Sequence, residues 1–102
     1  MSDTTNYEFE WEEAKAEANL AKHGVDFMEA MTVFADALLM TRYDDEHSDE
    51  EERWVSLGQS AAGRLLVVVH TFASISPATA LIRVISARSP TRRERGQYEQ
   101  ER

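Results

Sequence analysis

Aromatic and acidic residues alternate from Tyr7 to Trp11. Strict alternation is typical of a strand with one buried face, so we predict a short strand near a sheet edge. The next segment, residues 12–23, instead places its alanines and Leu20 on a narrow stripe at helical spacing. Gly24 follows, and a glycine there favours a left-handed helix cap. The pattern therefore predicts a strand followed directly by a helix.

A second helix is predicted to begin after Asp26. Asp26 and Glu29 have the spacing of a capping box, in which both side chains bond backbone N–H groups of the first turn. Apolar residues recur at helical spacing as far as Phe34. We expect this helix to bury four side chains, those of Phe27, Ala30, Met31 and Phe34.

The rest of the chain shows strand-like patterns separated by turn residues. We predict four strands, over residues 38–43, 53–59, 64–71 and 80–87. The connecting segments are predicted to be a charged loop over 44–52, a turn over 60–63 and a turn around Pro77 over 74–79. The third of these strands is apolar on both faces, which predicts a central position in the sheet.

The C-terminal segment has two candidate helix starts. Pro90, after Ser89, suits the first position of a helix, where its missing N–H needs no partner. Thr91 and Glu94 form a competing capping box. The element order is β-α-α-β-β-β-β-α. We therefore predict an α+β fold with a mainly antiparallel sheet, two N-terminal helices and one C-terminal helix.

Length and composition bound the architecture. The chain has 102 residues, which fits one domain over residues 7–102 after a disordered tail over 1–6. It has no cysteine, so disulfides and thiolate metal sites are excluded. The longest apolar run, residues 65–69, is too short to span a bilayer, and the N-terminus does not have the pattern of a signal peptide. We expect a soluble, cytoplasmic protein.

Charge is divided unevenly along the chain. Residues 1–52 carry a net charge of −13, whereas residues 53–95 carry +6, within a total of −8. The basic residues of the second segment are all arginines: Arg53, Arg64, Arg83, Arg88, Arg92, Arg93 and Arg95. Phosphate neutralisation supplies most of the affinity for nucleic acids, and arginine binds phosphate through two parallel N–H groups. The arginine-rich segment is therefore a candidate nucleic-acid surface.

Strand periodicity determines which arginines can meet His70. A four-residue turn pairs Gln59 with Arg64, and this register places Arg53 opposite His70. The same register predicts that alternate residues of both strands share the face of His70.

Arg83 and Arg88 are five positions apart, so a regular strand points them to opposite faces. Arg83 shares the face of His70 if Thr71 pairs with Ala80. A one-residue slip or a bulge places Arg88 there instead. In either register one of the two arginines can lie near His70.

A histidine beside arginines suits RNA cleavage without a metal. The ribose 2′-OH attacks the adjacent phosphate, which needs a general base, a cation for the developing charge and a proton for the leaving oxygen. His70 is a candidate base or acid, and Arg83 or Arg88 a candidate phosphate clamp. The alternative is a histidine that merely completes a strand.

The C-terminal helix adds candidate phosphate contacts. Arg92, Arg93 and Arg95 lie on it, close in sequence to the other arginines. Together with Arg53 they are candidate RNA-binding residues. The alternative for the three helical arginines is a solvated helix face.

The other two histidines have simpler interpretations. His23 lies at a predicted helix C-terminus, where a positive charge is favoured. His47 lies in the acidic segment 44–50, which suggests a hard-metal site but lacks the alternating ligands and turn glycine of a calcium loop. We interpret it as a solvated acidic loop, and we predict no metal and no cofactor.

Several separate stretches, in order over residues 7–99, match one family pattern. The first half contributes Phe9-Glu10-Trp11, Ala14-Lys15, Asn19-Leu20, Lys22-His23-Gly24-Val25, Phe27, Glu29-Ala30 and Val33-Phe34. The second half contributes His47-Ser48, Glu51-Glu52-Arg53-Trp54, Gly58-Gln59-Ser60, the stretch 63–71, the stretch 82–88, Thr91-Arg92-Arg93-Glu94-Arg95 and Tyr98-Glu99. In these stretches the chain resembles the BrnT family of bacterial toxins, relatives of the RelE-like ribonuclease toxins.

This resemblance implies a RelE-like fold and the toxin of a type II toxin–antitoxin system, which cleaves RNA and stops growth. It implies a BrnA-like antitoxin with a ribbon-helix-helix domain, contact with operator DNA only through that antitoxin, and a heterotetramer of two toxins on an antitoxin dimer. RelE-like toxins use arginine, lysine and tyrosine more than a histidine pair. The resemblance therefore favours Arg64, Arg83, Arg88 and Tyr98 as catalytic candidates over His70.

The charge balance leaves a second function open. A net charge of −8 is more acidic than we expect of an active ribonuclease toxin. A protein of this fold with little or no activity would serve as antitoxin partner and operon co-repressor, its acidic surface facing a basic antitoxin segment. A third alternative is a small sheet domain with an unrelated partner.

Overall fold

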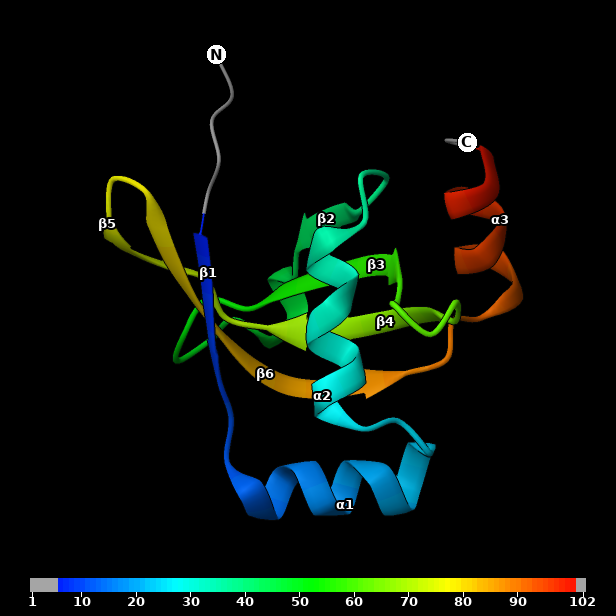
Figure 1. The fold of residues 1–102 in the computed structure, drawn as a ribbon, viewed down its shortest axis with the longest axis horizontal. Helices are drawn as coiled ribbons and strands as arrows, with labels where there is room; N and C mark the ends of the chain where they lie inside the picture. The colour runs from blue at the N-terminus through cyan, green and yellow to red at the C-terminus, as the bar shows by residue number, and fades with distance from the viewer. Residues whose placement is uncertain (1–5, 101–102) are drawn as a thin grey trace.

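A central β-sheet with helices on both faces organises the chain, and the computed structural model describes residues 6–100 (Figure 1). The elements in chain order are β1 (Asn6–Glu10), α1 (Glu13–His23), α2 (Phe27–Ala30), the 3-10 helix η1 (Met31–Ala35), β2 (Met40–Tyr43), the 3-10 helix η2 (Asp45–His47), β3 (Trp54–Gln59), β4 (Leu65–His70), β5 (Ala73–Ser76), β6 (Thr79–Arg88) and α3 (Arg92–Gln100). Of the predicted tail, residues 1–5 lie outside the described residues, and Asn6 already belongs to β1.

The strands lie in the order β1-β6-β4-β3-β2, and β5 pairs with β6 beside this path. The pairing of β1 with β6 is parallel, and the other pairings are antiparallel. β1 lies at an edge and β4 lies centrally, both as predicted. The predicted α+β fold with a mainly antiparallel sheet is confirmed.

Helices α1 and α2 with η1 cover one face of the sheet, which we call the inner face. The core on this face consists of Val25, Phe27, Ala30, Val33, Leu66, Val68, Ile82, Val84 and Ala87. Asn19 of α1 extends the sheet, because its side-chain amide donates to the Ala87 carbonyl at 2.9 Å and accepts from the Ala87 N–H at 3.1 Å. Two long-range bonds thus fix α1 to the edge of β6.

The first two helix caps follow the sequence pattern only in part. Gly24 ends α1 with φ of 69°, and the Asp26 carboxylate accepts from the Met28 N–H at 2.9 Å, both as predicted. Beyond α2 the chain tightens into η1. The Thr32 hydroxyl donates to the Glu29 carbonyl at 2.6 Å, a bond that competes with the α-helical ladder.

The residues that this helical segment buries differ from the prediction at two positions. Phe27 and Ala30 are buried as expected, whereas Met31 and Phe34 are half-buried and Val33 takes a core position. The 3-10 turn accounts for the change, since three residues per turn rotate the later side chains relative to an α-helix.

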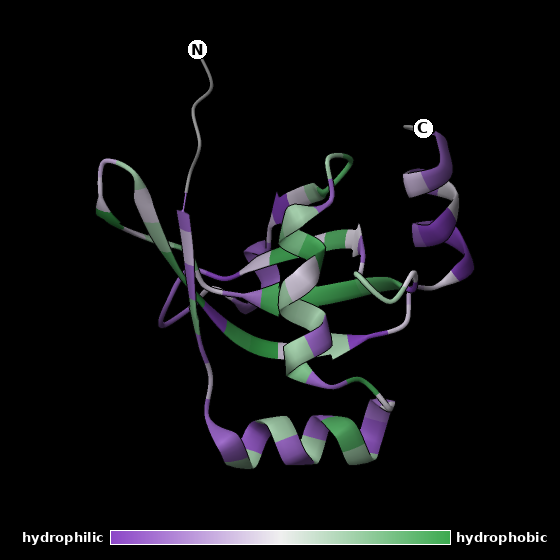
Figure 2. Cartoon of the chain, viewed as in Figure 1, coloured by the Kyte–Doolittle hydropathy of each residue, from purple (hydrophilic) through white to green (hydrophobic). Residues whose placement is uncertain are grey.

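Helix α3 covers part of the opposite, outer face. Tyr98 packs there with Val55, Leu57, Leu65 and Val67. Figure 2 shows the resulting contrast between a hydrophobic β4 and a largely hydrophilic α3. α3 begins through the capping box rather than at Pro90. The Glu94 N–H donates to the Thr91 hydroxyl at 3.1 Å, and the Thr91 N–H donates to the Glu94 carboxylate at 2.8 Å.

Two sequence-based expectations in the second half were wrong, the first only in part. The turn around Pro77 is confirmed at residues 77–78, but residues 74–76 of the predicted turn belong to the strand β5. All residues of β5 are exposed, so the strand shows no alternation. The predicted register of the β3–β4 hairpin is off by one residue: His70 pairs with Trp54, not with Arg53. Gly63, with φ of 88°, lets Ser60 pair with Arg64 across a shorter, three-residue turn.

A bulge in β6, one of the alternatives that the sequence leaves open, interrupts the regular alternation. Val69 pairs with Ser86, but His70 pairs with Val84, so Ile85 is an extra residue on β6. Val84 and Ala87 both belong to the inner core. Arg83 and Arg88 therefore both lie on the outer face, although they are five positions apart.

Within residues 6–100, no helix has the length and apolar character needed to cross a membrane.

Candidate functional site

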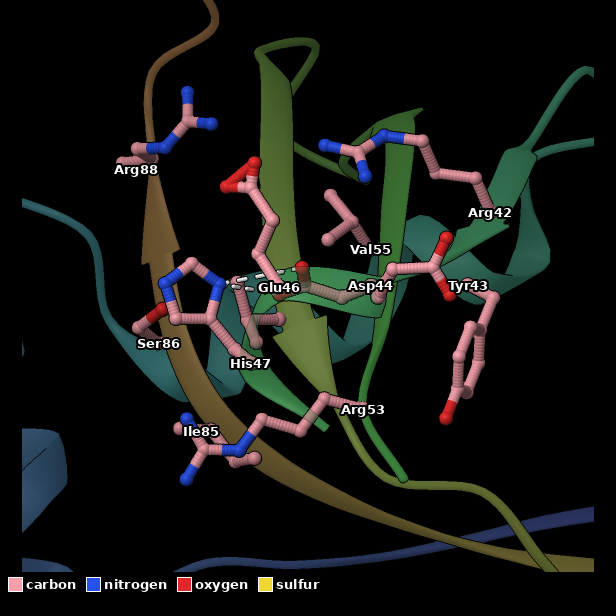
Figure 3. Close-up of a pocket in the computed structure, with 12 residues that line it drawn as sticks. Arg42, Tyr43, Asp44, Glu46, His47, Arg53, Val55, Ile85, Ser86 and Arg88 are labelled. Atoms are coloured by element: carbon pink, nitrogen blue, oxygen red, sulfur yellow. Dashed lines mark hydrogen bonds and ion pairs between the residues drawn. The ribbon is translucent and has the colours of Figure 1, made fainter. Parts of the chain in front are cut away.

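A cleft of about 540 Å³ lies on the outer face, between the sheet and the acidic loop 44–53 (Figure 3). Three arginines line it, Arg42 from β2, Arg53 at the end of the loop and Arg88 from β6. Its apolar floor consists of Val55, Val69 and Ile85. The remaining lining residues are Tyr43, Asp44, Asp45, Glu46, His47 and Ser86. The cleft thus brings together cations, one imidazole and carboxylates on an apolar base.

Hydrogen bonds at the base of the acidic loop hold it over the sheet. The Asp44 N–H donates to the Arg53 carbonyl at 2.9 Å, which extends the β2–β3 pairing by one step. The Ser48 hydroxyl donates to the Asp44 carbonyl at 2.5 Å and accepts from the Arg53 N–H at 3.0 Å. The loop is therefore closed at its base, and the predicted solvated loop is an ordered wall of the cleft.

His47 is oriented by Asp44. Its Nδ1 lies 3.0 Å and 3.2 Å from the two carboxylate oxygens of Asp44. The Asp44 side chain is only 11% exposed, whereas that of His47 is 64% exposed. An ionised carboxylate only accepts hydrogen bonds, so Nδ1 carries a hydrogen, and in the neutral imidazole the lone pair is then on Nε2. Figure 3 shows Nε2 pointing away from Asp44, on the side of the cleft where Ser86 and Arg88 lie.

Arg88 is held by a carboxylate of α3. Its two terminal nitrogens lie 2.8 Å and 3.0 Å from the Glu94 oxygens. This hydrogen-bonded pairing lowers the pKa of Glu94 from 4.5 to about 2, against the opposing effect of burial, and raises the pKa of Arg88. Because Glu94 also closes the capping box of α3, the helix start and the guanidinium are fixed by one side chain.

Arg83 and Arg53 both face Glu51 of the acidic loop. Arg83 forms a close ion pair with Glu51, and Arg53 lies 4.0 Å from the same carboxylate. The Nε of Arg53 is buried and has no hydrogen-bond acceptor among the described residues. Arg42 has no ion-pair partner within residues 6–100. The cleft therefore keeps guanidinium groups that a bound anion can use.

His70 lies on the inner face and not in the cleft. It is 1% exposed, and its ring meets the Phe34 ring edge-on at 4.9 Å between centroids. Nδ1 donates to the Thr71 carbonyl at 2.9 Å, so Nε2 accepts from the Ser56 hydroxyl at 2.7 Å. Burial lowers the pKa of His70, and the bond to Thr71 opposes that shift only in part. A buried, neutral imidazole of this kind supports the core.

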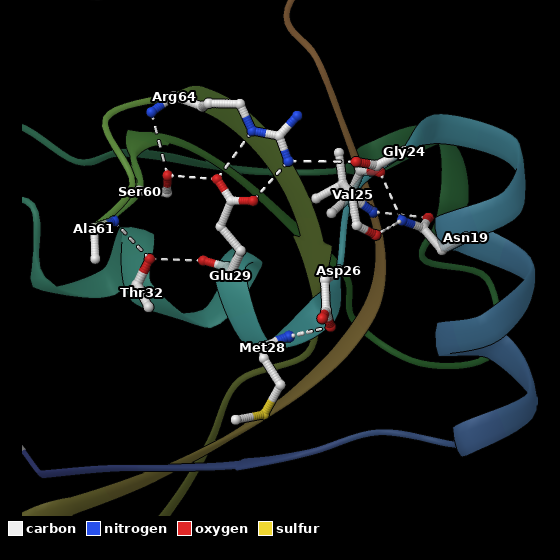
Figure 4. Close-up of polar contacts among 11 residues, drawn as sticks. Asn19, Gly24, Val25, Asp26, Met28, Glu29, Thr32, Ser60, Ala61 and Arg64 are labelled. Atoms are coloured by element: carbon white, nitrogen blue, oxygen red, sulfur yellow. Dashed lines mark hydrogen bonds and ion pairs between the residues drawn. The ribbon is translucent and has the colours of Figure 1, made fainter.

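Arg64 lies at the β3–β4 turn beside α2 (Figure 4). Its Nε and one terminal nitrogen lie 3.0 Å and 2.6 Å from the two Glu29 oxygens, and the terminal nitrogen also reaches the Gly24 carbonyl at 3.3 Å. The bond to Arg64 lowers the pKa of Glu29, while that of Arg64 is raised. Ser60 completes the cluster at 2.7 Å from Glu29. These contacts tie the turn to α2, and Arg64 does not line the cleft.

Tyr98 anchors α3 to the rest of the fold. It is 4% exposed, and its hydroxyl donates to the Asp36 carboxylate at 2.5 Å. Asp36 also accepts from the Gln59 N–H at 2.8 Å and from the Leu38 N–H at 2.9 Å. The geometry places Tyr98 under α3, next to the turn, and outside the lining of the cleft.

The three helical arginines are exposed on α3, and none of them lines the cleft. The structure thus brings together Arg53 and Arg88 in the cleft, with Arg83 on the same face and linked to Arg53 through Glu51. It separates these from Arg64, His70 and Tyr98.

Sequence reasoning missed two cleft residues, His47 and Arg42. His47 was interpreted as part of a solvated loop, although it lies in one of the stretches that carry the family resemblance. Arg42 belongs to a predicted strand, and the sequence pattern does not indicate which segment that strand pairs with. Among residues 6–100, no three histidine, aspartate or glutamate side chains converge as a metal site would require.

Comparisons with known proteins place the chain in a family. The chain matches, over residues 11–94, the family model described as the ribonuclease toxin BrnT of type II toxin–antitoxin systems. Among solved structures, the ribonuclease toxin BrnT of Brucella abortus is similar with a TM-score of 0.55 and 22% identity, covering 86% of this chain and 100% of that one. At this identity the similarity supports the fold alone. No curated protein matches the chain.

Proposed function

The chain belongs to the BrnT family of ribonuclease toxins of type II toxin–antitoxin systems, and we propose that it is a metal-independent endoribonuclease acting from the outer-face cleft. The observation that carries this proposal is the convergence of Arg42, Arg53 and Arg88 on one cleft. Arginine side chains bind phosphate bidentately and stay charged at every physiological pH.

The apolar floor strengthens the electrostatics of such a site. Val55, Val69 and Ile85 make the base of the cleft apolar, and charge interactions are stronger at lower effective dielectric. Cations placed before the reaction stabilise the negative charge that develops on the phosphate. Arg83 is a further candidate, since it lies on the same face and shares Glu51 with Arg53.

The remaining candidate residues from the sequence take other roles in this proposal. Arg92, Arg93 and Arg95 extend the positive surface along α3 and are candidates for contacts with RNA outside the cleft. Arg64, His70 and Tyr98 have structural partners that account for them, and we assign them no direct part in the reaction.

The expected consequences in the cell follow from the family. We expect RNA cleavage in the cytoplasm to arrest growth, and a BrnA-like antitoxin with a ribbon-helix-helix domain to neutralise the toxin. We also expect a heterotetramer of two toxins on an antitoxin dimer, with operator DNA bound only through the antitoxin.

Purified protein tests the proposal directly. Wild type should cleave RNA in the presence of EDTA, and Arg88→Ala or Arg83→Ala should relieve growth arrest when the toxin is expressed alone. Lys22→Ala is the matched control, because it removes a cation from α1, on the other face of the sheet. Cleavage that EDTA abolishes would contradict metal independence, and full toxicity of both arginine variants would contradict the site.

Glu94→Gln separates a chemical from a structural effect of Arg88→Ala. This variant breaks the same ion pair but keeps the guanidinium, so it should retain cleavage. Equal loss of activity in Arg88→Ala and Glu94→Gln would show that the pair supports the fold and not the reaction.

One observation favours the alternative function, an inactive binding protein. Both Arg83 and Arg88 already have carboxylate partners, so phosphate must displace an internal anion to reach them. If wild type leaves RNA intact at high concentration yet represses its operon together with the antitoxin, the co-repressor alternative is correct.

A further inference from the structure

We infer that His47 is the general base of the cleft and that Asp44 is the residue that positions it. This inference rests on the proposed ribonuclease function and adds the proton-transfer group that the arginines cannot supply. A guanidinium stays protonated near neutrality, so an arginine cleft alone binds phosphate but accepts no proton.

The fold presents His47 in the orientation that a base requires. In the neutral imidazole, the hydrogen bond from Nδ1 to Asp44 places the lone pair on Nε2, which is directed away from Asp44. Asp44 is itself fixed, because its N–H bonds Arg53 and its carbonyl accepts from Ser48. The backbone N–H and carbonyl of Asp44 therefore hold the loop in place, and its carboxylate orients the imidazole of His47.

The surroundings of His47 match the reaction. The residue lines the same cleft as Arg42, Arg53 and Arg88, and its side chain is 64% exposed, so a substrate can reach it. His70 is the opposite case: it is buried and both of its ring nitrogens have partners in the core. Of the two histidines, only His47 combines access, a lone pair and neighbouring cations.

The reaction step balances with these groups. Nε2 of His47 takes the proton of the ribose 2′-OH while the 2′-oxygen forms a bond to phosphorus and the bond from phosphorus to the 5′-oxygen breaks. The leaving 5′-oxygen takes a proton from solvent at the mouth of the cleft, and protonated His47 returns its proton to solvent. The products are a 2′,3′-cyclic phosphate and a 5′-hydroxyl, with the arginines holding the charge that develops on the phosphoryl oxygens.

The test compares single-turnover cleavage by wild type, His47→Gln and His23→Gln. A general base contributes about 10²- to 10⁴-fold, so His47→Gln should lose activity by that factor while its Kd for an uncleavable 2′-O-methyl RNA stays the same. His23→Gln is the matched control, since it removes an exposed histidine at the end of α1. In the pH–rate profile, the acid limb of the wild type should disappear in His47→Gln.

Two further variants separate catalysis from folding. His47→Ala should regain cleavage when imidazole is added, which a purely structural role would not allow. Asp44→Asn should lower kcat with little change in KM, because the amide can leave the imidazole in the wrong tautomer. Thermal unfolding of each variant tests whether the fold is intact.

The outcomes distinguish this inference from the function on which it rests. If wild type cleaves RNA and Arg88→Ala does not, but His47→Gln cleaves at the wild-type rate, the inference is wrong and the ribonuclease function stands. If wild type cleaves no RNA, both the inference about His47 and the proposed ribonuclease function are wrong.

Discussion

His70 shows how burial decides the role of a titratable residue. Its ring is enclosed by Phe34 and by strands β3 and β4, and its two nitrogens are used by Ser56 and Thr71. The hydroxyl of Ser56 in turn lies 2.8 Å from that of Thr41, so a chain of polar groups runs from β2 into the core. A protonated imidazole loses its hydration at this position, which is why the pKa of His70 is below 6.5.

This shift makes stability depend on pH. The unfolded chain binds a proton at His70 near pH 6.5, whereas the folded chain does so only at lower pH. The contribution of His70 to the free energy of unfolding should therefore be fully present above about pH 6.5. It should fall as the pH drops from there towards the pKa of His70 in the folded protein. Urea denaturation at several pH values measures this slope.

A flatter slope in His70→Gln would identify the residue responsible, and His23→Gln is the control for loss of an imidazole outside the core. An NMR titration of the wild-type imidazole gives the same information without a core substitution. Equal slopes in wild type and His70→Gln, with no depressed titration, would contradict the assignment.

At the scale of elements, close packing between η1 and β3 depends on Gly58. A Cβ at this position would lie 2.7 Å from Leu39 Cδ1 and 3.2 Å from both the Cβ and the carbonyl oxygen of Val33. The side chain of Leu39 can move, but the backbone of η1 is held by the hydrogen bonds of Thr32 and Asp36. η1 therefore lies against β3 at a distance that only a glycine allows.

Gly58→Ala should lower the free energy of unfolding by about 1–3 kcal/mol, the usual effect of overpacking. Gly96→Ala is the matched control. A Cβ at Gly96 meets nothing within 4 Å, and alanine in a helix interior is favoured by about 0.5–1 kcal/mol. Urea denaturation should thus move the two midpoints in opposite directions. A neutral Gly58→Ala would mean that η1 can shift.

Elements differ in how far local sequence determines them. The caps at Gly24, Asp26 and Thr91 are local, and each was found where its residues predict it. β5 has no local pattern, because its exposed residues form a strand only through pairing with β6. The position of His47 over the cleft depends on hydrogen bonds between loop ends nine residues apart in sequence. Such pairings depend on tertiary contacts, which a local sequence pattern does not encode.

At the scale of the whole molecule, an acidic protein gathers arginines at one site. The net charge is −8, whereas the cleft lining balances three arginines against the three carboxylates of Asp44, Asp45 and Glu46. Charges more than about 8–10 Å apart are largely screened at physiological salt, so the distant acidic residues have little effect on a phosphate in the cleft. The family assignment and the net charge are therefore compatible.

The salt dependence of RNA binding measures how many arginines take part. For single strands, the slope of log K against log salt is about −0.7 per neutralised phosphate, so contacts by Arg42, Arg53 and Arg88 alone give about −2. Additional contacts by Arg92, Arg93 and Arg95 would steepen it towards about −4. Fluorescence anisotropy with an uncleavable RNA provides the slope.

In the same titration, Arg42→Ala should reduce the slope by about 0.7, whereas Lys22→Ala should not change it. A slope near zero in wild type would show that phosphate contacts do not drive binding, and would count against the cleft as the RNA site.

The extra residue in β6 can be described as a change of parity. Five is an odd separation, and odd separations in a strand send two side chains through opposite sides of the sheet. Ile85 is an extra residue that has no partner on β4, so the alternation between the two arginines is that of an even separation. Arg83 and Arg88 therefore lie on the same side of the sheet. Deleting Ile85 would erase the bulge but leave Arg83 and Arg88 four positions apart, so both would still lie on the same side. A regular strand that kept all five positions would instead turn one of them into the apolar core. For this strand, the number of residues between two functional groups carries as much information as their identity.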